Sequence, residues 1–124
     1  MGKITLNLIG VSCFIGFIAF VLGVGGHVLG FFHVPSALFV LGTAGGLGLA
    51  GYREGGWIGF LRSFKRHLII AGVLGTIIGI IQMMQNISSP DEIGGGVAVA
   101  LLTTLYSLIL YGLTNAMVET APKC

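Results

Sequence analysis

Charged residues are scarce in this 124-residue chain, which has four acidic and six basic side chains, or 8% of its positions. Hydrophobic residues fill 55% of the positions, and the mean hydropathy is +1.02. A water-soluble fold of this size leaves much of its surface exposed, so it cannot bury so much apolar area. The shortage of charge therefore excludes a soluble domain and indicates an integral membrane protein.

Cysteine and the side chains of catalytic sites are also scarce. Cys13 lies in an apolar run and Cys124 lacks prenylation spacing, so we expect neither a disulfide framework nor a lipid-modification box. His27 and His33 share one connector but lack a third metal ligand. The chain shows no nucleophile–base set, catalytic carboxylate pair or phosphate-binding loop. We expect no enzyme, no metal site, no cofactor and no nucleic-acid partner.

What the chain has instead is four uncharged apolar stretches, each close to the roughly 20 residues with which a helix crosses a bilayer. They cover about residues 4–24, 34–51, 68–84 and 97–116. Glycine is interleaved with Leu, Ile and Val, as in closely packed membrane helices, and the candidate packing positions are Gly42, Gly46, Gly72, Gly75 and Gly79. The sequence predicts one all-α membrane domain over residues 1–124, with four transmembrane helices in two hairpins. The segment "NISSPDEIGGG" predicts a capped turn before the last helix.

The basic residues are distributed asymmetrically among the connectors. All six lie at the N-terminus, in the middle connector or at the C-terminus: Lys3, Arg53, Arg62, Lys65, Arg66 and Lys123. The first and third connectors contain none. The positive-inside rule then predicts that both termini and the middle connector are cytoplasmic.

The middle connector, "YREGGWIGFLRSFKRH", repeats aromatic residues at helical spacing, with cations on other faces. That pattern is typical of a short amphipathic helix in the membrane interface, here over about residues 55–66. Its candidate lipid contacts are Trp57, Arg62, Lys65 and Arg66. An anchor that orients the next helix is favoured over a regulatory lipid site, because interfacial aromatic and basic residues commonly have that role.

Polar and small residues form two stripes on the last two apolar segments, since positions three, four and seven apart share a helix face. One stripe comprises Ala100, Thr104, Ser107, Tyr111 and Asn115. The other comprises Gly72, Thr76, Gly79 and either Gln82 or Met83. Such hydroxyls can bond to their own helix carbonyls and simply pack between helices, or they can line a polar cavity. Both interpretations remain open from the stripes alone.

The segments "GVLGTIIGIIQMM" and "SPDEIGGGVAVALLTTLYSLIL" resemble the paired channel helices of the MotA/TolQ/ExbB proton-channel family. The first half, "GGHVLGFFHVPSALFVLGTAGGLGLAG", is similar to the first helical hairpin of MotA. The resemblance covers nearly the whole chain. It favours a MotA-like subunit over ExbB and TolQ, which have three spans rather than four.

The resemblance implies a stator-like, ion-driven motor in the bacterial inner membrane. Five such subunits surround two copies of a single-span partner, whose membrane aspartate carries H⁺ or Na⁺. The family's ion-path threonines carry over by motif to Thr76 and Thr104, with Thr103 adjacent, and Ser107 and Tyr111 extend the candidate path. The predicted spans contain no acid of their own, which fits a carrier supplied by the partner.

Three departures from the family pattern bear on function. MotA inserts a large cytoplasmic domain between its second and third spans, where this chain has about fifteen residues, so the usual torque contact with a flagellar rotor is not expected. The proline that commonly begins the third helix is absent from "RHLIIAGVLG", and "GPG" before the last helix is "GGG" at residues 94–96.

Two other functions are compatible with the composition. A structural or assembly subunit would use the glycines for packing alone. A small multidrug-type transporter would need an ionisable group in the membrane to couple its substrate to protons, and the spans lack Asp, Glu, Lys and Arg.

Overall fold

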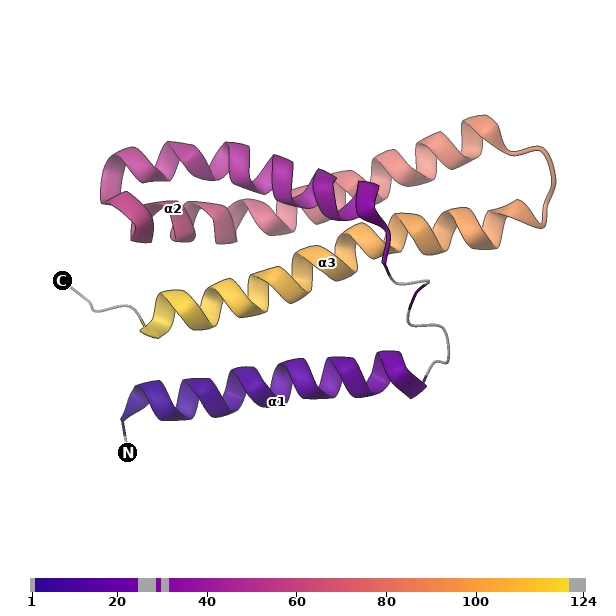
Figure 1. Cartoon of the computed structure of the whole chain (residues 1–124). Helices are drawn as coiled ribbons and strands as arrows, with labels where there is room; N and C mark the ends of the chain where they lie inside the picture. The colour runs from indigo at the N-terminus through magenta and orange to yellow at the C-terminus, as the bar shows by residue number, and fades with distance from the viewer. Residues whose placement is uncertain (1, 25–28, 30–31, 121–124) are drawn as a thin grey trace.

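The computed structural model describes residues 2–24, 29 and 32–120 and is helical in its long elements. In chain order these are α1 (Lys3–Val24), α2 (Val34–Asn86) and α3 (Glu92–Thr120), shown in Figure 1. No strand occurs within the described ranges. The all-α expectation agrees with this architecture, and each of the three helices is long and apolar enough to cross a membrane.

The longest helix, α2, reverses direction at two glycines. Gly55 (φ −155°, ψ 22°) and Gly56 (φ 59°, ψ −140°) leave the helical region, and Figure 1 shows the chain turning back there. Side chains strongly disfavour the Gly56 conformation, so this position requires glycine. We call residues 34–54 the first arm of α2 and residues 57–86 its second arm. The second and third apolar segments expected from the sequence, about residues 34–51 and 68–84, lie in the first and second arm, respectively.

The predicted interfacial helix over residues 55–66 is not a separate element. From Trp57 the second arm continues as an uninterrupted helix to Asn86. No Gly or Pro lies between Gly59 and Gly72, so the sequence contains no residue that would end a helix near His67. The change from basic to apolar residues at this point does not by itself end a helix. Two of its aromatic residues, Phe60 and Phe64, contact the first arm, because a Cβ atom at Gly48 would lie 3.1–3.3 Å from them.

Helix starts agree with the sequence signals. The side chain of His33 caps α2 by accepting a hydrogen bond from the Ser36 backbone N–H (3.3 Å), and a proline stands in the first helical turn. Before α3, the Glu92 carboxylate accepts a hydrogen bond from the Ser88 N–H (3.0 Å). The predicted capped turn at "SSPDE" is therefore present.

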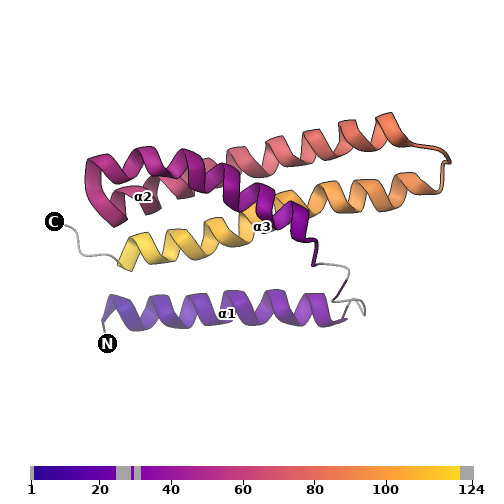
Figure 2. The same cartoon turned by 45° about the horizontal axis from the view of Figure 1, so that its top comes forward.

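Packing is concentrated where α2 meets α3. The core residues Val40, Ala44, Leu68 and Ala71 are fully buried, and Phe64, Tyr106, Leu110 and Tyr111 pack against them. In both views α3 lies beside α2, while α1 lies on the other side of α3 (Figures 1 and 2). The most hydrophobic window of α1 contains no buried residue. The packed unit is thus α2 with α3, and α1 is attached at its edge.

The two ends of the helical bundle differ in their charged residues. The N-terminal end of α1, the turn of α2 and the C-terminal end of α3 lie at one end of the molecule (Figure 1). This cationic end contains the four basic residues around the turn, Arg53, Arg62, Lys65 and Arg66. The α2–α3 connector lies at the opposite end and contains Asp91 but no basic residue.

Candidate functional site

Three threonine hydroxyls meet between the second arm of α2 and α3. Thr76 Oγ1 contacts Thr104 Oγ1 within hydrogen-bonding distance and lies 3.1 Å from Thr103 Oγ1. Two backbone carbonyl oxygens complete the group: Gly72 O lies 3.0 Å from Thr76 Oγ1, and Ala100 O lies 3.0 Å from the same atom. We call these three side chains and two carbonyls the hydroxyl cluster.

The hydroxyl cluster contains fewer protons than hydrogen-bond contacts. Each hydroxyl donates one proton and can accept others. Thr103 Oγ1 donates to Ala100 O at 2.6 Å, while Gly72 O is within reach of both Thr76 and Thr104, the latter at 3.4 Å. The proton between Thr76 and Thr104 can belong to either oxygen. The cluster can therefore present an acceptor or a donor by rotating its hydroxyls.

Glycine allows the two helices to approach closely enough for these contacts. A Cβ atom at Gly72 would overlap Ser107 Oγ, and one at Gly79 would lie 2.9 Å from the Ala100 Cβ. At Gly75 the nearest atoms would be Phe39 Cε1 at 2.9 Å and Thr103 Cβ at 3.0 Å. Every added methyl would force the helices apart. The predicted packing glycines of the second arm thus form the contact that holds the hydroxyl cluster.

The other two predicted packing glycines make no such contact. A Cβ atom at Gly42 or Gly46 would meet nothing within 4 Å. The first arm instead buries Val40, Ala44 and Gly48, which are four residues apart and share one face. Because positions 42 and 46 are offset by two residues, or about 200° around the helix, they point away from that face. Gly42 and Gly46, which were predicted to pack between helices, therefore make no packing contact within this chain.

The hydroxyl-bearing side chains at this contact differ in how much of their surface is exposed. Ser107 is 1% exposed and donates to the Thr104 carbonyl at 2.9 Å, and Thr103 is 6% exposed. Thr76 and Thr104 are half-buried. Ser107 is thus enclosed by its contact with Gly72, whereas Thr76 and Thr104 retain exposed surface for an ion, water or a neighbouring helix.

Farther along α3, two residues of the predicted polar stripe interact with a cation. Lys65 Nζ donates a hydrogen bond to Asn115 Oδ1 at 2.9 Å and lies 5.9 Å from the centre of the Tyr111 ring. Tyr111 packs against the core. The lysine therefore connects the second arm to α3 near the cationic end.

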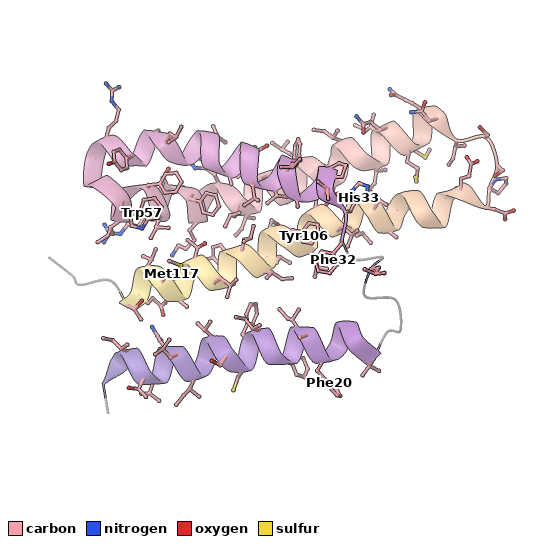
Figure 3. The ribbon with its side chains drawn as sticks, viewed as in Figure 1. Phe20, Phe32, His33, Trp57, Tyr106 and Met117 are labelled. Carbon is pink, nitrogen blue, oxygen red and sulfur yellow. The ribbon has the colours of Figure 1, made fainter. Side chains whose placement is uncertain are left out.

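A cavity of about 310 Å³ extends from the start of α2 to the hydroxyl cluster. Its lining includes His33, Ser36, Gln82 and Thr103. The His33 ring is held by Ser36, with Nδ1 2.8 Å from Ser36 Oγ, and the His33 backbone N–H donates to the Tyr106 hydroxyl at 2.9 Å. Figure 3 shows His33 and Tyr106 close together. We call this space the His33 cavity; its partly polar lining extends from the start of α2 to Thr103.

The His33 cavity was not predicted from the sequence. Its lining comes from both arms of α2 and from α3, which are far apart in the chain. The motif His33-Val-Pro-Ser36 could have indicated a capped helix start, but not the tyrosine that binds it. The described residues contain no group of three or more His, Cys, Asp and Glu side chains that could hold a metal ion. His27 lies outside the described residues.

The amino-acid sequence is similar to those of known proteins. Motility protein A of Aquifex aeolicus is 56% identical over 39 residues, which are 32% of this chain and 15% of the relative. Chemotaxis protein PomA of Vibrio alginolyticus is 44% identical over 52 residues, 42% of this chain and 21% of the relative. The chain thus spans only about a fifth of these relatives. No solved structure matches the chain.

The family match covers the site itself. Residues 56–120 match the MotA/TolQ/ExbB proton channel family, and this range contains both helices of the hydroxyl cluster. The matched range extends from the turn of α2 to the end of α3. The resemblance of the segments at residues 72–84 and 89–110 is therefore confirmed, and the chain belongs to the MotA/TolQ/ExbB proton channel family.

Proposed function

We propose that this chain is the ring-forming subunit of an ion-driven membrane motor that moves H⁺ or Na⁺. Five copies surround two copies of a single-span partner, and the partner's membrane aspartate carries the ion past each subunit. The observation that carries the proposal is the hydroxyl cluster, which places three hydroxyls and two carbonyls at the contact of the family-matched helices.

The distribution of acidic residues supports a carrier from outside the chain. Its four acids are Glu54, Asp91, Glu92 and Glu119, and all lie near helix ends or connectors. A carboxylate is costly in hydrocarbon, so its movement through a bilayer requires polar groups at the same depth. The half-buried Thr76 and Thr104 supply such groups, and the His33 cavity supplies an approach for water or an ion from the outer end.

The arrangement in the membrane follows from the turn of α2. A straight 53-residue helix would extend about 80 Å, far beyond the roughly 30 Å hydrocarbon core. The two arms each suit one crossing, so with α1 and α3 the proposed topology has four spans. The basic turn and both termini then lie on the cytoplasmic side, in agreement with the positive-inside rule.

The work output differs from the usual torque contact of the family. The two arms of α2 join at Gly55 and Gly56, so no domain is inserted between them. We propose that ring motion is transmitted through the membrane region or the partner. Similarity to a motility protein and a chemotaxis protein supports the motor class.

Ion uptake into proteoliposomes tests the proposal. The chain is reconstituted with the single-span, aspartate-bearing protein encoded beside its gene, and uptake is measured under an H⁺ or a Na⁺ gradient. Thr76→Val and Thr104→Val preserve shape but remove hydroxyls whose hydrogen bonds are typically worth about 0.5–1.5 kcal/mol. Each change is expected to lower uptake by roughly two- to tenfold, and the double change by more.

Thr114→Val is the matched control, because Thr114 is buried on the same helix outside the cluster. It should leave uptake near the unsubstituted level. Native mass spectrometry of the same preparation should show five copies of the chain. Unchanged uptake in the double variant, with an intact ring, would favour the alternative of a structural or assembly subunit. Uptake of cationic drugs without a partner would favour the multidrug transporter.

A further inference from the structure

A second cavity, of about 460 Å³, lies beside the turn of α2 at the cationic end. Its wall contains charged and polar side chains from both arms: Glu54, Arg62, Ser63, Arg66 and His67. Its remaining lining is Ala50, Gly51, Gly55 and Gly59. This volume is in the range of small-molecule sites in proteins, about 300–1,000 Å³. We call this space the turn cavity.

Small residues create the turn cavity. The backbones of Gly51 and Gly59 approach closely, because a Cβ atom at Gly59 would overlap the Gly51 carbonyl oxygen. With only hydrogen atoms as side chains there, the arms meet at their backbones and leave space for the longer side chains around them. His67 is fixed on the wall, since its Nδ1 lies 2.8 Å from the Ser63 carbonyl oxygen and 3.4 Å from Ser63 Oγ.

The turn cavity contains both signs of charge. Arg62 and Arg66 are one helical turn apart and exposed, and Glu54 belongs to the opposite arm. Within the described part of the chain, none of the three forms an ion pair or hydrogen bond. Lys65, by contrast, bonds to Asn115 and does not line the cavity. Two guanidinium groups and one carboxylate are therefore left facing a shared space.

Exposed aromatic residues flank the turn cavity. Tyr52 and Trp57 are 56% and 64% exposed and flank the turn, and Figure 3 shows Trp57 at this end of the molecule. The Trp57 ring stacks on Phe60 with centroids 5.4 Å apart, which fixes its position. Exposed Trp and Tyr residues concentrate where a membrane protein passes from hydrocarbon to headgroups. In the proposed topology, the turn cavity is therefore placed to meet lipid headgroups.

We propose that the turn cavity binds a phospholipid with a phosphoethanolamine headgroup. The arginines donate hydrogen bonds to the phosphate, for which the planar guanidinium is well suited. The Glu54 carboxylate accepts hydrogen bonds from the headgroup ammonium. An anionic headgroup without an amine would leave Glu54 opposed by like charge, and a quaternary amine would offer it no N–H donor. The proposal depends on membrane insertion and not on ion conduction.

Lipid retention in native mass spectrometry tests the site, using the full chain in mild detergent with phosphatidylethanolamine, phosphatidylglycerol or phosphatidylcholine. The unsubstituted chain should retain phosphatidylethanolamine best. Arg62→Gln with Arg66→Gln should lower its retention by about tenfold. Glu54→Gln should reverse the preference between phosphatidylethanolamine and phosphatidylglycerol. Arg53→Gln is the matched control for Arg62→Gln alone, because each removes one positive charge near the turn and only Arg62 lines the cavity; retention should not change in Arg53→Gln.

Each outcome decides between the headgroup site and its alternatives. Equal retention of the three lipids would show that no headgroup is recognised, and a loss in Arg53→Gln equal to that in Arg62→Gln would show general surface charge; either result would overturn the site. Soluble glycerophosphoethanolamine and inorganic phosphate distinguish the source of the phosphate. If either displaces the bound lipid at millimolar concentration, the lipid assignment is wrong. Circular dichroism of each variant checks that the helices are intact, so that a loss of retention reports the cavity.

Discussion

The α2–α3 contact and the α1–α3 contact join helices of similar apolar character, yet the residues of α1 are much less buried than those of α2 and α3. In the most hydrophobic windows of α2 and α3, 22% of the residues are buried, compared with 0% in α1. The glycines differ in the same way. Added Cβ atoms at Gly72, Gly75 and Gly79 would clash across the α2–α3 contact, whereas those at Gly10, Gly16 and Gly23 would meet nothing within 4 Å.

This difference shows that hydropathy alone does not pack helices in a membrane. Lipid tails solvate Leu and Phe as well as a neighbouring helix does, so small residues and polar contacts decide which helices join. The α2–α3 contact has both, in the glycines and the hydroxyl cluster. α1 has apolar side chains that are largely exposed, including Phe17 and Phe20. Its outer face is therefore available to lipid or to another protein.

For the glycines at the α2–α3 and α1–α3 contacts, the largest expected effect of a substitution is at Gly72. In Gly72→Ala the new methyl would lie 2.7 Å from the Ser107 Cβ, an atom that cannot move without α3. Overpacking of this kind typically costs about 1–3 kcal/mol. Tm in detergent should fall clearly, and so should ion uptake, because the helices separate at the hydroxyl cluster. Unchanged Tm would mean that the α2–α3 contact is looser than described.

A smaller effect is expected at the α1–α3 contact. In Gly112→Ala the nearest atoms are Phe14 Cζ at 3.0 Å and Cε1 at 3.2 Å, at the far end of a side chain that is 38% exposed. A cavity of about 160 Å³ lies beside both residues, so the ring can turn aside. We expect a loss of less than about 0.5 kcal/mol. A loss as large as that of Gly72→Ala would show that α1 is packed as firmly as α2.

The smallest effect is expected in α1 itself, at Gly16. A Cβ atom at this position has open space, so Gly16→Ala removes no contact and adds no clash. Tm of the isolated chain should remain within measurement error. If the ring is destabilised while the isolated chain is not, Gly16 faces a neighbouring subunit. Comparing Tm with the subunit count by native mass spectrometry separates the two cases.

Helical periodicity predicted which residues share a face, but not which neighbour the face meets. It grouped Gly72 with Thr76 and Ala100 with Thr104, and the structure brings these groups together. It did not distinguish the buried face of the first arm, Val40, Ala44 and Gly48, from the glycines at 42 and 46. Both sets have spacing of four residues and small members. Only the placement of the second arm selects between them.

Local breakers predicted the limits of α1 and the start of α2 well. The last helix was expected over about residues 97–116, but α3 extends over Glu92–Thr120 and includes the glycines at 94–96. The absence of a breaker near residue 67 explains the structural correction near the turn. The expected first span, about 4–24, agrees with α1 at Lys3–Val24. The glycine pair at 55–56 reverses the chain, but the predicted change of element near residue 67 does not occur. The two cavities were beyond sequence analysis, since each combines residues from both arms of α2 after folding.

The first arm of α2 is fastened at both of its ends. At one end the Gly51 and Gly59 backbones abut, and at the other the His33 N–H is bonded to the Tyr106 hydroxyl of α3. Two attachments so far apart resist sliding of this arm along its neighbours, so α2 and α3 respond to a force as a stiff body. The shallow α1–α3 contact is then the compliant joint of the molecule, and under the proposed function strain from ring motion would be absorbed there before it reached the threonines.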